Sequence, residues 1–314
     1  DYGAETMRNN QPEIPVHTDP DEWPVRENKD VDIVYGNPPC APFSNNSTFE
    51  GDRSEGVMED KRLENHRQMI DVLEKVEPRF WVFESVTQIY DKAGPLLKRI
   101  EDIARDMGYN VTHFFHDVNF YGNPQSRKRY FCILHDTPLD FAPPDFEDAP
   151  TVGDVLDELT ADDPRAHHKP PEEIWDKWKE IIPEVGPGEK LRHYFVKEYP
   201  GVERGRPLQQ TRRLDPERPA WTAIGGFRFI HPTENRLLAS NEMSRLQGYP
   251  EDYEFVGTSH QRMDLICRGV CAEMGDYLGR LFEDAEDKKP QQQADMLVDF
   301  REEPGRIQFL QSFE

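Results

Sequence analysis

The sequence predicts an α/β fold in which helices cover a largely parallel sheet, and two observations indicate it. Up to about residue 136, short apolar runs that resemble buried strands alternate with segments whose apolar residues recur at helical spacing. The run Phe80-Trp81-Val82-Phe83 is continuously apolar, as in a strand covered on both faces. Strand, helix, strand, helix, strand is the order that arises when helices connect the strands of a parallel sheet.

The individual elements follow from apolar spacing and from residues that favour turns. The predicted strands lie at residues 31–35, 80–83, 109–116, 129–135 and 222–224. The predicted helices lie at residues 1–8, 60–76, 94–107, 240–246 and 272–281. Pro78 and Gly108 mark helix ends, because proline cannot continue a helix and glycine readily adopts the left-handed conformation that closes one.

Composition divides the chain into four predicted regions. Residues 1–136 form the α/β domain, and residues 137–219, which contain many Pro and acidic residues, form a smaller and irregular domain. Residues 220–283 complete the α/β domain. Residues 284–314, with the polar stretch Lys288-Lys289-Pro290-Gln291-Gln292-Gln293, are predicted to form a linker and a tail.

Charge and cysteine content restrict the class of protein. The 314 residues include 61 Asp and Glu against 38 Lys and Arg, a formal net charge of −23 that would suit a high-salt cytoplasm. Residues 190–218 are locally basic, as in a solvated loop or a polyanion contact. No apolar run approaches the roughly 20 residues that span a bilayer, so a cytoplasmic protein without a membrane partner is expected. Four Cys at unpaired spacings predict neither a disulfide framework nor a metal site.

Three reactive groups lie at the ends of predicted strands. Cys40 follows the first strand, Glu84 closes the second, and Arg127 and Arg129 precede another. Each alone has a structural interpretation, as a small hydrophobe, a helix cap or a solvated face. Together they favour a catalytic role. Nearby positive charge lowers the pKa of a thiol, and a carboxylic acid can share a proton with a ring nitrogen. The pattern predicts covalent addition to an electron-poor heterocycle.

Five segments resemble motifs of the C5-cytosine methyltransferase family in order and spacing over about residues 1–282. Residues 36–44 (Gly-Asn-Pro-Pro-Cys-Ala-Pro-Phe-Ser) resemble the catalytic loop, and residues 83–86 resemble the Glu-Asn-Val motif. Residues 125–129 resemble the Gln-x-Arg-x-Arg motif. Residues 218–236 and 241–250 resemble the segments that close the family's core after its target recognition domain.

The resemblance implies a Rossmann-like S-adenosylmethionine-dependent methyltransferase sheet, with residues 137–219 as a smaller target recognition domain. Cys40 would add to C6 of a cytosine flipped out of duplex DNA, Glu84 would contact N3, and Arg127 and Arg129 would hold the base and the catalytic loop. S-adenosylmethionine would donate the methyl group to C5. The resemblance also implies cofactor contacts at Glu5, Asn37, Pro38 and Pro39, and DNA contacts at Ser44, Gln125, Arg204, Arg206, Arg212 and Arg213. It implies a nucleoid-associated enzyme of restriction, protection or regulation.

Departures from the family pattern leave alternatives open. The family's Phe-x-Gly-x-Gly-Gly cofactor loop is absent from the sequence, so the chain could start late, a companion polypeptide could supply the loop, or the cofactor site could be broken. Ser85 stands where the family has Asn, and residues 267–271 differ from the family's Gly-Asn-Ala-Val-Pro. A non-catalytic relative that binds DNA or a partner subunit and a tRNA-directed enzyme are the alternatives. Amino-group methyltransferases have an aromatic residue where this chain has Cys40, and a thiol can add to a base but cannot stack on it.

Overall fold

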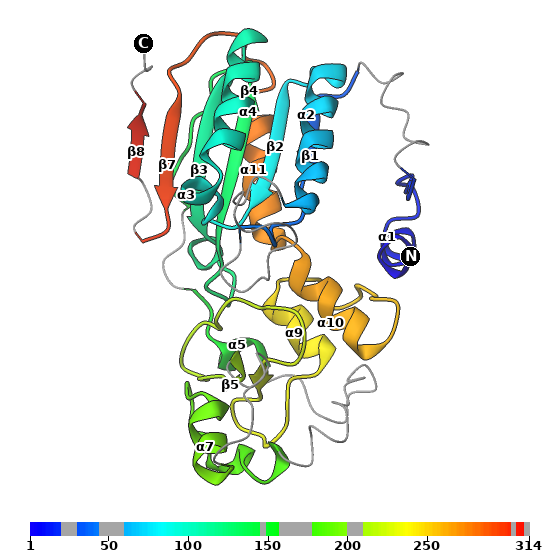
Figure 1. The fold of residues 1–314 in the computed structure, drawn as a ribbon, viewed down its shortest axis with the longest axis vertical. Helices are drawn as coiled ribbons and strands as arrows, with labels where there is room; N and C mark the ends of the chain where they lie inside the picture. Colours follow the sequence, from blue (N-terminus) through cyan, green and yellow to red (C-terminus); the bar gives the residue numbers. More distant parts are fainter. Residues whose placement is uncertain are drawn as a thin grey trace. The chain divides into compact units, whose positions relative to one another are not determined.

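A computed structural model describes residues 1–19, 30–43, 60–144, 149–156, 178–199, 210–302 and 306–310. The chain divides into two compact units (Figure 1). Unit 1 comprises Asp1–Glu22, Val118–Arg127 and Phe146–Asp276, and unit 2 comprises Trp23–Asp117, Lys128–Asp145 and Tyr277–Glu314. These units are defined by packing, whereas the predicted domains are defined by their expected roles in the protein. The units therefore do not test the predicted domain boundaries, which stay a prediction.

Unit 2 is built on a six-stranded sheet of order β1-β2-β4-β3-β7-β8, which confirms the predicted α/β fold. The strands are β1 (Ile33–Gly36), β2 (Phe80–Ser85), β3 (Asn110–Asp117), β4 (Lys128–His135), β7 (Met296–Phe300) and β8 (Arg306–Phe309). β1, β2, β3 and β7 run in one direction, and β4 and β8 run against them. β4 is antiparallel to β3 because residues 118–127 alone join the two strands, and a parallel crossover needs a dozen residues or more.

Helices on one face of this sheet confirm the predicted periodicity (Figure 1). They are η3 (Lys61–Leu63), α2 (Glu64–Val76), α3 (Ile89–Lys92) and α4 (Gly94–Asp106). Ile70 and Leu73 of α2 are buried in one cluster with Trp81 and Phe83 of β2, so the apolar stripe of the helix covers the strand. α2 ends where Glu77 adopts a left-handed conformation with φ 50°, directly before the proline that cannot continue the helix.

The opposite face of the sheet is covered by the second half of α11 (Ala272–Glu283). Phe282 stacks on Phe80 with ring centroids 4.6 Å apart, and Tyr277 lies against Phe114 at 5.9 Å. β2 is therefore buried on both faces, as its uninterrupted apolar run predicts. Within the described part of the chain, no helix combines the length and apolar character that crossing a bilayer requires.

The C-terminal region differs from the predicted linker and tail, because β7 and β8 extend the sheet beyond β3. Met296, Val298 and Phe300 alternate along β7 and are buried, whereas the residues between them are half-buried. Asp299 pairs with Arg301 at 2.7 Å, so the charge in this strand is partnered. The alternation of period two is the strand signal that the polar composition of the preceding residues concealed.

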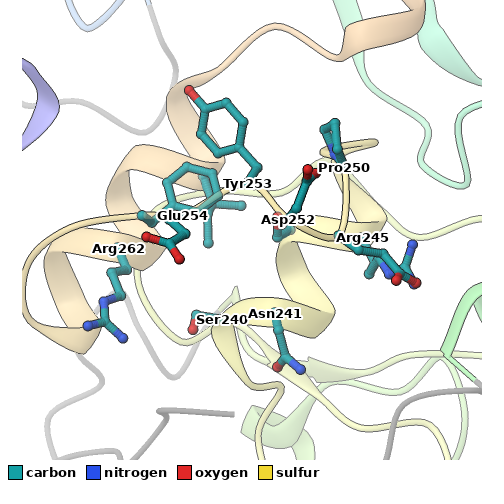
Figure 2. A pocket seen from close by; sticks show the side chains of 12 residues that line it. Ser240, Asn241, Arg245, Pro250, Asp252, Tyr253, Glu254 and Arg262 are labelled. Carbon is teal, nitrogen blue, oxygen red and sulfur yellow. The ribbon is translucent and has the colours of Figure 1, made fainter. Parts of the chain in front are cut away.

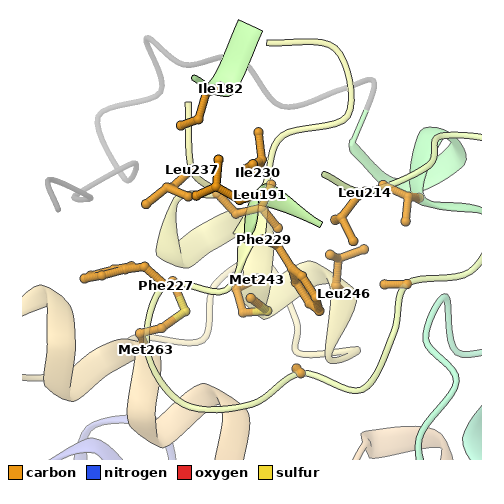
Figure 3. Packing of buried hydrophobic residues seen from close by; sticks show 14 of the residues in the cluster. Ile182, Leu191, Leu214, Phe227, Phe229, Ile230, Leu237, Met243, Leu246 and Met263 are labelled. Atoms are coloured by element: carbon orange, nitrogen blue, oxygen red, sulfur yellow. The ribbon is translucent and has the colours of Figure 1, made fainter. Parts of the chain in front are cut away.

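In its described residues, unit 1 has short helices, two short strands and its own hydrophobic core. Its elements are α1 (Tyr2–Asn10), η4 (Val118–Tyr121), α5 (Val152–Leu156), η5 (Ile182–Glu184), α7 (Leu191–Glu198), β5 (Arg212–Arg213), β6 (Phe229–Ile230), α9 (Ser240–Leu246) and α10 (Ser259–Arg268). Figure 3 shows Leu214, Ile230 and Leu246 converging in this core from a loop, a strand and a helix. α10 was not predicted, although Thr258 and Gln261 form a capping box at its start.

The predicted strand at residues 222–224 is wrong, because other partners hold its backbone. The N–H of Ala223 donates to Oε1 of Gln125 at 2.7 Å, and the hydroxyl of Thr222 donates to the carbonyl of Ser126 at 2.9 Å. A buried side-chain amide thus replaces a neighbouring strand as hydrogen-bond partner, and residues 222–224 join no strand ladder among the described residues.

Candidate active site

Cys40 lies in a tight turn after β1, in unit 2. Buried Pro38 and exposed Pro39 precede it, and the N–H of Phe43 donates to the Cys40 carbonyl at 3.0 Å. Prolines restrict the backbone on the approach to the thiol, so less conformational freedom remains to be lost when a substrate is attacked. Cys40 follows β1 and Glu84 lies near the end of the neighbouring parallel strand β2, so both lie at the carboxyl ends of strands, where ligands bind in folds of this class.

Cys40 is the one cysteine of the four that is not buried. Burial raises the pKa of the Cys132 thiol and of the Cys267 thiol to about 12. Cys271 is 1% exposed. Because the thiolate is the nucleophile and solvent access is needed, Cys40 is the cysteine suited to attack a substrate.

Phe43 anchors the C-terminal end of this turn. Its ring is fully buried and meets the ring of His66 edge-on at a centroid distance of 5.4 Å. Lys92 Nζ donates to the Phe43 carbonyl at 2.8 Å. Burial lowers the pKa of His66 to about 4, so this histidine packs as a neutral ring at physiological pH. The segment 40–43 is therefore fixed at its far end by packing and by one hydrogen bond.

Glu84 lies near the end of β2 and is only 3% exposed. Arg129 Nε lies 3.0 Å from Oε1 of Glu84, and the side-chain amide of Asn37 donates to Oε2. β4 supplies Arg129 from one neighbouring strand, and the end of β1 supplies Asn37 from the other. The structure thus brings together Glu84 and Arg129, two of the four residues that the sequence predicts to be catalytic, and adds a residue predicted to bind the cofactor.

Arg127 lies in unit 1 and is 3% exposed. Its guanidinium group donates to the carbonyls of Ala223, Cys267 and Gly269 at 2.9, 3.0 and 3.1 Å. These contacts join two chain segments that lie about 45 residues apart in the sequence, so the observed role of Arg127 is structural. A role in holding the base or the catalytic loop stays a prediction.

Gln125, which is predicted to contact DNA, is fully buried, and the DNA contact stays a prediction. Its amide nitrogen donates to Oε1 of Gln247 at 2.5 Å and to the Leu246 carbonyl at 3.2 Å, and its oxygen accepts from Ala223. Gln247 in turn donates to the Ile266 carbonyl at 2.8 Å. The two glutamines therefore form a buried amide network that joins the segment around residue 125 to α9 and α10.

The arginines predicted to contact DNA divide into two kinds. Arg213 is 5% exposed and donates to the carbonyls of Val185, Ile182, His231 and Glu234 and to the side chain of Asn235. Its donors are used inside unit 1, so its observed role is structural, and its contact with DNA stays a prediction. Arg212 is partly exposed, with its guanidinium group 4.3 Å from the ring centroid of Trp221. Ser44, Arg204 and Arg206 lie outside the described residues.

Residues of the downstream motifs form a buried ion pair that the sequence did not predict. Arg236 donates to both carboxylate oxygens of Glu242, at 2.8 and 2.6 Å, and also contacts Glu234 at 2.9 Å. Glu242 is 1% exposed, and the Ala239 N–H donates to it at the start of α9. The bidentate pair fixes the entry to α9, so these motif residues stabilise unit 1.

The residues predicted to hold the cofactor lie in both units. Pro38, Pro39 and Asn37 follow β1 in unit 2, whereas Glu5 is exposed in the first turn of α1 in unit 1. These four residues offer few donors to a nucleoside, because two are prolines and the amide of Asn37 is bonded to Glu84. These four residues alone do not amount to a complete cofactor site.

Unit 1 contains a cavity of about 420 Å³ beside α9 and α10 (Figure 2). Its lining residues include two acids, Asp252 and Glu254, and two arginines, Arg245 and Arg262, together with Tyr253. This mixture of charges gives no preference for an anionic ligand. Of the predicted site residues within the described part of the chain, none lines the cavity.

Comparison with known proteins identifies the family. Residues 2–282 match the family model described as C-5 cytosine-specific DNA methylase. The chain belongs to this family. Among the members it resembles is M.PspPI of Psychrobacter sp., named a type II methyltransferase, with 26% identity over 299 residues, 89% of this chain and 70% of the relative. M.MthTI of Methanothermobacter thermautotrophicus, also named a type II methyltransferase, is 26% identical over 262 residues, 77% of this chain and 75% of its own.

Solved structures confirm the methyltransferase fold. The Entamoeba histolytica methyltransferase EhMeth matches with a TM-score of 0.62 at 14% identity, covering 90% of this chain and 88% of its own. Schizosaccharomyces pombe Dnmt2 matches with a TM-score of 0.55 at 16% identity, covering 90% and 88%. β7 and β8 lie beyond the part of the chain that matches the C-5 cytosine methylase model.

Proposed function

We propose that this chain is a DNA (cytosine-5-)-methyltransferase that acts through a covalent bond between Cys40 and C6 of cytosine. The observation that carries the proposal is the position of the one unburied thiol, at the sheet edge where buried Glu84 is held by Arg129. Membership of the C-5 cytosine methylase family supports a DNA substrate, as do relatives named type II methyltransferases.

The thiolate of Cys40 begins the reaction by donating an electron pair to C6, which forms the S–C6 bond. The pair of the C5–C6 double bond is then available at C5, while N3 takes up a proton. Glu84 is suited to share that proton, because a carboxylate beside a ring nitrogen stabilises the protonated ring. After C5 is methylated, loss of the C5 proton restores the double bond, and the S–C6 pair returns to sulfur.

Arg129 would orient Glu84 rather than touch the methyl group. Its Nε binds Oε1 of the carboxylate, and its Nη1 donates to the Lys128 carbonyl at 2.8 Å, which fixes the guanidinium group. A charge-assisted hydrogen bond of this kind restricts the carboxylate to one orientation. The pair therefore supplies a fixed acid–base group at the end of β2.

S-adenosylmethionine is the methyl donor that the family implies, and it supplies an electrophilic methyl group. Glu5, Asn37, Pro38 and Pro39 stay the predicted contacts, and these four residues are too few to hold this cofactor alone. We therefore assign no step to a cofactor contact. A companion polypeptide that completes the site stays a prediction, which addition of further subunits to an inactive chain would test.

The target cytosine must leave the DNA stack, because C6 is inaccessible in a duplex. Of the arginines predicted to contact DNA, Arg212 is described and partly exposed, so it is suited to contact phosphate, whereas Arg213 is buried. Binding to chromosomal DNA would place the protein at the nucleoid. Restriction, protection and regulation are equally compatible with this reaction.

The test is transfer of tritiated methyl groups from S-adenosylmethionine to duplex DNA, with tRNA as the competing substrate. We expect label in duplex DNA, located by bisulfite sequencing as 5-methylcytosine. Label found in tRNA alone would show that the substrate is tRNA and not DNA. Label on an exocyclic amino group would contradict the covalent route, and DNA binding without any transfer would favour the non-catalytic relative.

A further inference from the structure

We propose that Asn37 is a positioning residue, whose side-chain amide holds Glu84 in the orientation that meets the target base. The inference rests on the proposed function, and it gives Asn37 a role other than the predicted cofactor contact. Its basis is a hydrogen bond between the side chains of two residues that lie 47 positions apart in the sequence.

The register of the sheet explains why Asn37 reaches Glu84. β1 and β2 pair in parallel with Gly36 opposite Phe83. Asn37 follows Gly36, and Glu84 follows Phe83. The two side chains therefore lie side by side where the pairing of β1 with β2 ends. Nδ2 of Asn37 donates to Oε2 of Glu84. Asn37 is exposed and Glu84 is 3% exposed, so an accessible amide contacts a buried carboxylate.

Arg129 holds the other oxygen from the opposite side. Glu84 is paired with Phe131 of β4, and Arg129 lies two residues from Phe131 on the same face of that strand. Its Nε lies 3.0 Å from Oε1. Each carboxylate oxygen therefore has a fixed donor, and these donors come from the two strands that flank β2.

Contacts at both oxygens restrict the carboxylate more than a contact at one. The terminal torsion of a glutamate side chain is broad, so a donor on a single oxygen restricts the plane of the group less than donors on both. The amide of Asn37 holds the second oxygen and so helps to set the plane. Under the proposed function, this plane sets the direction from which Glu84 meets a ring nitrogen and shares its proton. Misplacement of a catalytic group by about 1 Å can cost 10²-fold in rate.

The test compares wild type with Asn37→Leu, which keeps the side-chain size and removes the amide. We expect kcat for methyl transfer to duplex DNA to fall about 10- to 100-fold, while KM for S-adenosylmethionine changes less than about threefold. A residue that contacts the cofactor would instead raise this KM. An unchanged kcat, or a rise in KM as large as the fall in kcat, would overturn the proposal.

A second measurement detects the hydrogen bond between Asn37 and Glu84 without measuring activity. Failure of this proposal can therefore be distinguished from failure of the proposed function. The side-chain amide of Asn37 is assigned in a ¹H–¹⁵N spectrum by its absence from the Asn37→Leu spectrum. In wild type we expect one of its protons at the low-field position of a hydrogen bond to a carboxylate. In Glu84→Ala that proton should move to the position of a solvated amide, and in Glu84→Gln it should move part of the way. An amide signal that is the same in all three proteins would overturn the proposal.

Discussion

Replacing Cys40 with alanine is expected to lower the rate of methyl transfer by at least about 10³-fold, which corresponds to about 4 kcal/mol of activation free energy. The reason is that addition to C6 needs a thiolate, and the remaining cysteines are buried. Cys40→Ser should be nearly as inactive, because its hydroxyl stays protonated at neutral pH. Initial rates of tritium incorporation into duplex DNA measure the effect.

Cys132→Ala is the matched control for this loss. Cys132 is fully buried in the sheet of unit 2, and burial raises the pKa of its thiol to about 12. Its removal should cost about 1 kcal/mol of stability and leave the rate within about threefold of wild type. A Cys40→Ala enzyme that keeps the wild-type rate would show that the reaction does not use a covalent bond.

Replacing Arg127 with alanine is expected to lower the free energy of unfolding by about 3–5 kcal/mol. The substitution removes the donors to the carbonyls of Ala223, Cys267 and Gly269, which are then buried without these partners. Arg127→Lys should recover less than half of the loss, because one ammonium group cannot span three carbonyls as a guanidinium fork does. Urea unfolding, followed by tryptophan fluorescence, measures the change.

Arg218→Ala is the control for the Arg127 experiment. The side chain of Arg218 is 76% exposed and its nitrogen lies 3.6 Å from Asp215, so the loss should stay below about 0.5 kcal/mol. If Arg127→Ala were as stable as this control but no longer bound DNA, the structural role assigned to Arg127 would be wrong. The predicted role in holding the base would then gain support.

The elements with the strongest local signals were predictable from the sequence. β2, α2 and α4 could be predicted from apolar spacing alone. A strand buried on both faces is apolar at every position, whereas a helix buried on one face is apolar at every third or fourth position. The sequence pattern does not indicate β7, because the lysines and glutamines before it are typical of a linker. The antiparallel direction of β4 follows from its short connection to β3, whereas the alternation of strands and helices indicates only a parallel sheet.

The site was predictable as a set of residue types but not as a set of contacts. The motifs identified Cys40, Glu84 and Arg129. Each of these residues lies at or near the end of a strand, and the strand ends meet at one edge of the sheet. The motifs gave no sign that Gln125 is buried, because a glutamine in a network has the same sequence pattern as an exposed one. The bond between Asn37 and Glu84 depends on strand register, which a single sequence does not specify.

The most direct test of the covalent mechanism uses duplex DNA in which 5-fluorocytosine replaces the target cytosine. Fluorine at C5 cannot leave as a proton, so the S–C6 bond should persist after methyl transfer. We predict a protein–DNA adduct in the presence of S-adenosylmethionine, with the nucleotide mapped by mass spectrometry to the peptide that contains Cys40. Methylation of ordinary cytosine without any adduct, or an adduct on another residue, would contradict the mechanism.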